Sequence, residues 1–236
     1  MKTLKKQILL LALFGAAINS NAQTTGWETG VTLSGGASDI IITNIQPNGV
    51  DEAELLNNTI RPRFYYSAGV YGRKFFKESY GIQVGAQYSS FAFGPETYTF
   101  QNYQGENIGT GKDVIRFSYI EIPIQFVYKK DIGKISVGAF AGASAAILLQ
   151  SYYKSVTRIE DNKDVSKDNY TDFSRPINVF VDAGAFFRYK ITEQFAIDAK
   201  PFFRMGALPF FKKQEMPNLD ALFIAGGLNV STVWMF

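Results

Sequence analysis

The clearest pattern in the chain is the unbroken alternation of apolar and non-apolar residues over residues 119–126, read YIEIPIQF. Successive side chains of a β-strand point to opposite faces of a sheet. One face of this strand carries isoleucines and Phe126, and the other carries Glu121, Pro123 and Gln125. Proline removes a hydrogen bond from the strand ladder, so we expect a bulge or a local break at Pro123.

The same two-residue period predicts eight strands after residue 26. They cover residues 27–35, 63–75, 80–93, 114–129, 134–150, 175–189, 194–205 and 221–236. The start of the fourth strand is irregular, because Arg116 and Ser118 fall on its apolar side. This irregularity predicts a bulge or the emergence of the strand from a membrane.

The segments between these strands alternate in length. Residues 36–61, 94–113, 151–174 and 206–220 are long, whereas residues 76–79, 130–133 and 190–193 are short. Bacterial outer-membrane barrels have an even number of strands, short periplasmic turns and long external loops. We therefore predict an all-β fold, an eight-stranded antiparallel up-and-down transmembrane β-barrel, formed as one domain by residues 23–236.

Alternation alone does not say which face meets lipid, and a secreted, soluble lipocalin-like barrel stays as an alternative. The polar face favours the membrane, because it mixes Gly, Ser, Gln and Asn with few charges. Aromatic residues also gather near the strand ends, as they do in membrane-interface girdles. They are Trp27, Phe75, Phe76, Tyr80, Phe126, Tyr128, Tyr189, Phe195, Trp234 and Phe236.

The first 22 residues have the features of a cleaved export signal. Lys2, Lys5 and Lys6 precede an apolar run over residues 8–17, which is too short to span about 30 Å of hydrocarbon. Small residues at positions 20 and 22 predict cleavage before Gln23. We expect Sec-dependent export, with residues 1–22 removed and residues 23–236 retained.

Charge and composition exclude several classes of function. The chain carries a net +3, and without the three signal lysines the balance becomes 24 − 3 − 21 = 0, so nothing points to nucleic acid. The absence of cysteine and histidine removes thiol chemistry, the usual general base and the commonest transition-metal ligand. We expect no metal and no cofactor.

Together, the alternating loops, the YIEIPI core and the terminal Phe236 resemble the PorT-like outer-membrane β-barrel family of Bacteroidetes-type bacteria. The resemblance covers nearly the whole mature chain. It implies an OmpA-like eight-stranded barrel in the outer membrane of a Gram-negative bacterium, and one branch of the family is tied to protein secretion and gliding. Phe236 resembles the signal that the barrel assembly machinery recognises.

Strand parity points nine charged side chains into the barrel. They are Glu28, Arg63, Arg73, Glu121, Asp182, Arg188, Asp198, Lys200 and Arg204. An eight-stranded barrel is only wide enough for side chains to fill it, and buried charges must be paired or hydrated. We predict a structural salt-bridge plug, with a gate or a narrow ion path as the alternative.

We predict that the protein is not an enzyme. Known outer-membrane hydrolases and the eight-stranded lipid acyltransferase use histidine, which this chain lacks. Asp182 and Asp198 could form an acid pair. Pairing with Arg188, Lys200 and Arg204 is the preferred interpretation.

The predicted loops also carry apolar residues, namely Ile40, Ile41, Ile42, Tyr98, Phe100, Tyr103, Leu208, Phe210 and Phe211. These residues either pack on one another over the barrel rim or form an external binding surface. The leading hypothesis is a structural or adaptor barrel. It sits in outer-membrane lipid and binds a protein or polysaccharide through its external loops. A small solute or ion pore is the runner-up.

Overall fold

A computed structural model describes residues 26–45, 59–76, 79–159, 162–212 and 219–236. The predicted export signal lies outside these residues. The elements are β1 (Trp27–Ile45), β2 (Ile60–Phe76), β3 (Tyr80–Pro95), β4 (Tyr98–Gln101), β5 (Asn107–Ile132), β6 (Ile135–Ile159), β7 (Asn162–Asn169), the 3-10 helix η1 (Thr171–Phe173), β8 (Ile177–Lys190), β9 (Phe195–Gly206) and β10 (Leu219–Met235). Within these ranges, no helix is long and apolar enough to cross a membrane.

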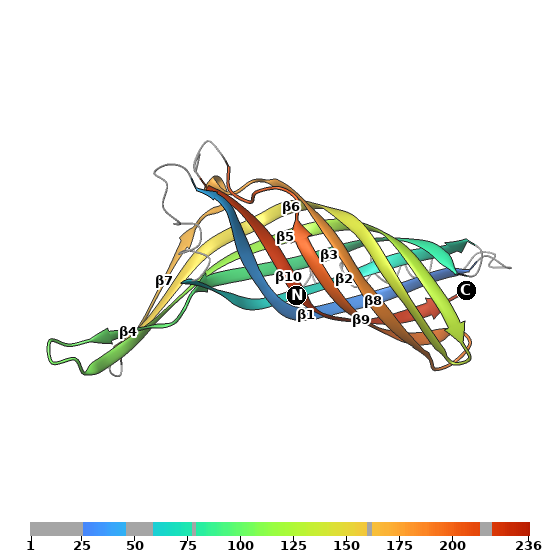
Figure 1. The fold of residues 1–236 in the computed structure, drawn as a ribbon, viewed down its shortest axis with the longest axis horizontal. Helices are drawn as coiled ribbons and strands as arrows, with labels where there is room; N and C mark the ends of the chain where they lie inside the picture. Colours follow the sequence, from blue (N-terminus) through green and yellow to red (C-terminus); the bar gives the residue numbers. More distant parts are fainter. Residues whose placement is uncertain (1–25, 46–58, 77–78, 160–161, 213–218) are drawn as a thin grey trace, which may run out of the picture.

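Eight of the strands close into a ring (Figure 1). The order around it is β1, β2, β3, β5, β6, β8, β9 and β10, and pairing of β10 with β1 closes it. Each pair of neighbours in the ring is antiparallel. The predicted eight-stranded up-and-down barrel is confirmed.

The apolar face of each ring strand points out of the barrel. In β5, Ile122, Ile124 and Phe126 are 51–56% exposed, whereas Glu121 is 0% exposed. Water would penalise such a continuous apolar outer surface, so this barrel needs an apolar solvent around it. The soluble lipocalin-like alternative is wrong, because that fold would bury the isoleucines and expose the glutamate.

The interior has two layers. The half next to the short turns holds the charged side chains together with two small apolar clusters, and the half next to the long connections holds an aromatic core. That core includes Tyr65, Phe91, Phe93, Phe117, Tyr119, Phe180, Phe210, Phe211, Phe223, Ile40 and Ile42. The prediction that loop residues pack over the rim is therefore confirmed for Phe210 and Phe211, while Tyr103 is fully exposed. Ile40 and Ile42 pack there too, but they lie in β1, which continues ten residues beyond its predicted end, so the start of the predicted loop 36–61 is wrong.

The sheet of the barrel continues beyond the rim, which corrects two predicted loops. Segments 94–113 and 151–174 contain β4, β7 and long additions to β5 and β6. We call β4, residues 107–116 of β5, residues 152–159 of β6 and β7 the β-extension, seen at the lower left of Figure 1. Water covers most of this sheet, so its strands lack the apolar alternation that marks a half-buried strand.

Pro123 causes an interruption rather than a bulge. Pairing between β3 and β5 passes from Val84–Ile124 to Gln87–Glu121 without a change of register, skipping Pro123. On the β6 side Pro123 pairs with Ser144 in an unbroken ladder. The predicted break is confirmed on one side, and the predicted bulge at this residue is wrong, since a missing N–H donor needs no extra residue.

A bulge lies in β6 instead. Pairing of β5 with β6 changes register between Ser118 and Tyr119. The extra residue is Leu149 of β6, which has no partner on β5 between Leu148 and Gln150. β5 itself keeps its parity, with Phe117, Tyr119 and Glu121 all inside and 0% exposed. The predicted bulge at the start of the fourth predicted strand is therefore not in that strand, and Arg116 and Ser118 are polar residues on its outer face.

Candidate functional site

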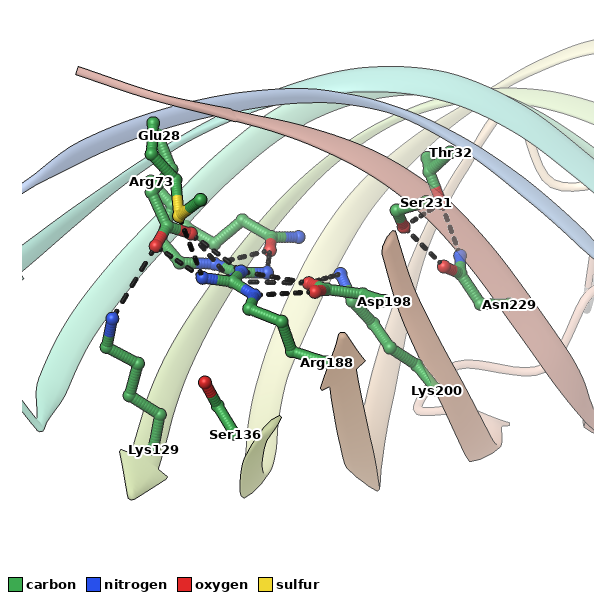
Figure 2. Close-up of polar contacts among 12 residues, drawn as sticks. Glu28, Thr32, Arg73, Lys129, Ser136, Arg188, Asp198, Lys200, Asn229 and Ser231 are labelled. Atoms are coloured by element: carbon green, nitrogen blue, oxygen red, sulfur yellow. Dashed lines mark hydrogen bonds and ion pairs between the residues drawn. The ribbon is translucent and has the colours of Figure 1, made fainter. Parts of the chain in front are cut away.

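Charged side chains meet inside the barrel near the short turns, in a group that we call the turn-end cluster (Figure 2). Arg188 lies at its centre and donates to Glu28 at 2.6 Å and to Asp198 at 2.7 Å. Arg73 donates to the same Glu28 at 3.1 Å and lies 3.5 Å from Asp198. Lys129 lies 3.7 Å from Glu28 at the edge of the cluster. Two carboxylates are thus held between two guanidinium groups.

The fold assembles this cluster in two ways. Glu28 and Arg73 are directly opposite each other on β1 and β2, as are Arg188 and Asp198 on β8 and β9. The contacts of Arg188 with Glu28 cross the interior instead, since β8 and β1 are three strands apart around the ring. Pairing of neighbouring strands therefore forms two ion pairs, and closure of the barrel brings these two pairs into contact.

A second group, the central cluster, surrounds Glu121. This carboxylate accepts hydrogen bonds from Arg204 at 2.8 Å, from Gln87 at 2.8 Å and from Ser89. Arg204 also lies 4.0 Å from Asp182, its direct neighbour on β8. Glu121, Arg204 and Asp182 are at most 6% exposed. The glutamate of the alternating stretch is thus the acceptor of an interior network.

Two glutamines connect the clusters. Gln83 accepts from Arg73 at 2.6 Å and donates to Gln125 at 2.8 Å, and Gln125 donates to Asp182. A continuous hydrogen-bonded path therefore runs along the inner wall. It joins Arg73 to the acids around Arg204.

A small polar cavity of about 40 Å³ lies between the clusters. One water needs roughly 10–15 Å³ of this measure, so the cavity has room for about three. Tyr71, Asp182 and Arg204 line it, and each has a buried polar atom without a hydrogen-bond partner among the described residues. Lys200 also lines it, with its ammonium 3.9 Å from Asp198 and 4.6 Å from the centre of the Tyr71 ring.

Parity reasoning misassigned one residue to the network and missed another. Arg63 is half-buried and donates to the carbonyl of Pro95 near the opposite rim. It stands ten residues before Arg73 on β2, about 33 Å along the strand, too far to join the turn-end cluster. Lys129 has the same parity as Glu121 and Gln125, a signal that could have identified it.

The geometry favours closure over transport. Removing water from a charge is costly unless ion pairs and hydrogen bonds compensate, and both clusters provide them. The aromatic core then covers the polar layer, with Phe91 stacked on Phe180 at 4.7 Å and Phe223 on Phe210 at 4.4 Å between ring centres. Among the described residues, no group of His, Cys, Asp or Glu could hold a metal ion.

The chain also matches a known protein family. The model of a family described as "Outer membrane protein beta-barrel domain" matches residues 21–203, well over half of the chain. The chain belongs to this family. It is therefore an outer-membrane barrel of Gram-negative bacteria, and its exposed isoleucines face lipid. No curated protein sequence matches the chain.

Solved structures of other outer-membrane barrels resemble this one weakly. Ail of Yersinia pestis, in complex with the heparin analogue sucrose octasulfate, has 12% identity and a TM-score of 0.34, covering 89% of this chain and 99% of that one. OprG of Pseudomonas aeruginosa has 7% identity and a TM-score of 0.40, covering 91% and 97%. The protease OmpT of Escherichia coli has 8% identity and a TM-score of 0.40, covering 92% and 99%. We draw no functional argument from similarities at this level.

In an outer-membrane barrel the short turns are periplasmic and the long connections are external. The turn-end cluster therefore lies at the periplasmic end of this barrel. The aromatic core and the β-extension lie at its external end. In the part of the chain that the structure describes, the external end thus carries the four strand segments of the β-extension above a filled barrel.

Proposed function

We propose that the protein is a non-enzymatic, closed outer-membrane barrel that acts as a structural or adaptor protein and binds through its β-extension. The observation that carries this proposal is the filled interior, in which an ion-pair network is covered by an aromatic core. Among the described residues, the β-extension provides an external surface beyond the filled barrel. The PorT-like resemblance of residues 119–124 supports the adaptor role.

The acids inside the barrel support a non-enzymatic role. Asp182 and Asp198 each face an arginine, Arg204 and Arg188, on the neighbouring strand. Both acids are at most 6% exposed. A general acid or base must reach the proton that it transfers. Asp198 is hydrogen-bonded to Arg188, and the cavity that Asp182 lines, about 40 Å³, has room for a few waters but not for a substrate.

Planar-bilayer recording tests closure against the runner-up, a small solute or ion pore. We expect the purified, folded protein to give no stable single-channel current, because side chains fill the cross-section. A porin inserted in the same bilayers is the positive control. Reproducible current steps from the wild-type protein that are absent from boiled samples would contradict the closed-barrel proposal.

Biogenesis is the second part of the proposal. We propose that residues 1–22 direct export and are cleaved before Gln23, and that Phe236 is the signal read by the barrel assembly machinery. Protein isolated from the outer membrane should have the mass of a chain starting at Gln23, and deletion of Phe236 should lower the folded, heat-modifiable fraction. A full-length mass would contradict cleavage before Gln23. An undiminished folded fraction without Phe236 would contradict its role as the assembly signal.

A further inference from the structure

The two faces of the β-extension differ in charge. Residues directly opposite each other on neighbouring strands share a face of a sheet. Tracing the register from β5 through β6 to β7 gives one face with four rows. They are Arg116–Tyr152–Asn169, Val114–Lys154–Lys167, Lys112–Val156–Val165 and Thr110–Arg158–Lys163. Among the described residues of these rows, six are cations and none is an acid.

The acids occupy the other face. Asp113, Asp164 and Asp168 lie in the alternate rows, next to Ser155, Thr157 and Tyr153 respectively. A simple alternation of lysine and aspartate in β7, read NKDVSKDN, produces this separation. The cationic face is thus not neutralised by the neighbouring acids, which point away from it.

The cationic face is the outer one, which continues the lipid-facing wall of the barrel. On β5 the residues that alternate with it, Ile115 and Phe117, pack into the aromatic core inside. Arg116 lies four residues beyond the lipid-facing Ile120, about 13 Å along the strand. The cations therefore begin where the hydrocarbon-facing surface ends.

Like charges on this face are placed directly against each other. Lys154 pairs with Lys167, and Arg158 pairs with Lys163. All four side chains are exposed. Like charges directly opposite each other destabilise a sheet, and an anion over these two pairs would relieve the repulsion. The ring of Tyr152, whose centre lies 4.0 Å from the Lys167 ammonium, compensates part of one charge. This arrangement, independent of the overall charge, indicates an anionic ligand.

We propose that this outer face of the β-extension binds the phosphate groups of lipid headgroups in the external leaflet. The inference rests on the proposed function, in which the β-extension is the binding surface, and it names the ligand. Lysine and arginine are the usual partners of phosphate, and each cation near an anionic membrane surface contributes to binding. A lipid held against the barrel wall would keep its acyl chains on the exposed isoleucines and its phosphates at the level of Arg116, Lys154 and Lys167.

Binding of lipid A to the folded protein in zwitterionic micelles tests the proposal. The probes are lipid A with both phosphates and the same lipid dephosphorylated, titrated at low salt. The test variant is Lys154→Gln/Lys167→Gln. Its control is Lys130→Gln/Lys134→Gln, which removes the same charge from exposed positions at the periplasmic rim.

We expect the test variant to bind phosphorylated lipid A about 25-fold more weakly than wild type. Each of the two removed cations should account for about a fivefold loss of affinity, the equivalent of ~1 kcal/mol. The control should stay within about twofold of wild type. The wild-type protein should bind dephosphorylated lipid A at least as weakly as the variant binds the phosphorylated form, because four cations of the face remain in the variant. Heat-modifiable migration on gels checks that both variants are folded.

Equal affinities of wild type and test variant would overturn the inference, as would an equal loss in the control. A soluble sulfated polysaccharide is the second probe. If it bound through the same lysines while the lipid phosphates had no effect, the face would be a glycan site instead. Neither outcome touches barrel closure, which the bilayer recordings measure separately.

Discussion

Replacing Arg188 with methionine is expected to lower the free energy of unfolding by about 3–5 kcal/mol. Arg188 donates to both Glu28 and Asp198, which are at most 3% exposed. Its removal takes the shortest hydrogen bonds from two carboxylates buried at the periplasmic end of the barrel. Arg73, Lys129 and Lys200 remain near them, but Lys129 and Lys200 lie 3.7 Å and 3.9 Å away. Breaking a buried hydrogen-bonded ion-pair network is among the costliest changes that a single substitution can make.

Urea-induced unfolding in lipid vesicles measures this effect, with the matched change Arg61→Met as the control. Arg61 pairs with Glu96 at 3.3 Å, and these side chains are 46% and 70% exposed. Exposed ion pairs contribute about 0–1 kcal/mol, so the control should unfold nearly as wild type does. Similar losses in the two variants would show that burial does not determine the strength of the Arg188 contacts.

Truncation of Phe223 to alanine is expected to destabilise the barrel by about 3–5 kcal/mol. Phe223 is 0% exposed and lies at the centre of the aromatic core. Its ring centre is 4.4 Å from that of Phe210, 5.0 Å from Phe117 and 5.1 Å from Phe91. Alanine would lose the transfer free energy of the ring and leave a cavity that rigid neighbours cannot fill.

Phe203→Ala is the matched control for this prediction, measured by the same unfolding transition. Phe203 is 56% exposed on the outer wall, where lipid surrounds it. Acyl chains fill the vacated space, so the cavity contribution disappears and the loss should be clearly smaller than for Phe223. A larger loss for Phe203 would show that the aromatic core is not what stabilises the external end.

Much of the ring could be predicted from residue parity. In the strand that carries Glu121, alternation correctly assigned the isoleucines to the outside and the glutamate to the inside. The short turns fix the register of each hairpin, so the Arg188–Asp198 and Asp182–Arg204 neighbours follow from counting back from the turn. The bulge opposite Ser118 was not predicted, because its extra residue, Leu149, lies in the neighbouring strand β6.

The β-extension had no such signal. The segment NKDVSKDN is polar on both faces, and a strand surrounded by water has no reason to alternate apolar with polar residues. Its pairing with β6 is a continuation of backbone hydrogen bonding beyond the rim. The cationic outer face became visible only when the register of three strands was known.

The amino-acid sequence by itself determined the class of fold, the lipid-facing surface and the charged residues of the interior, since side chains alternate between two faces within each strand. It did not reveal the aromatic core that fills the external half of the interior. It did not determine which interior charges meet. The contacts of Glu28 with Arg188 and of Glu121 with Arg204 join strands three places apart around the ring. Such contacts depend on the closure and stagger of the whole barrel, which no single strand encodes.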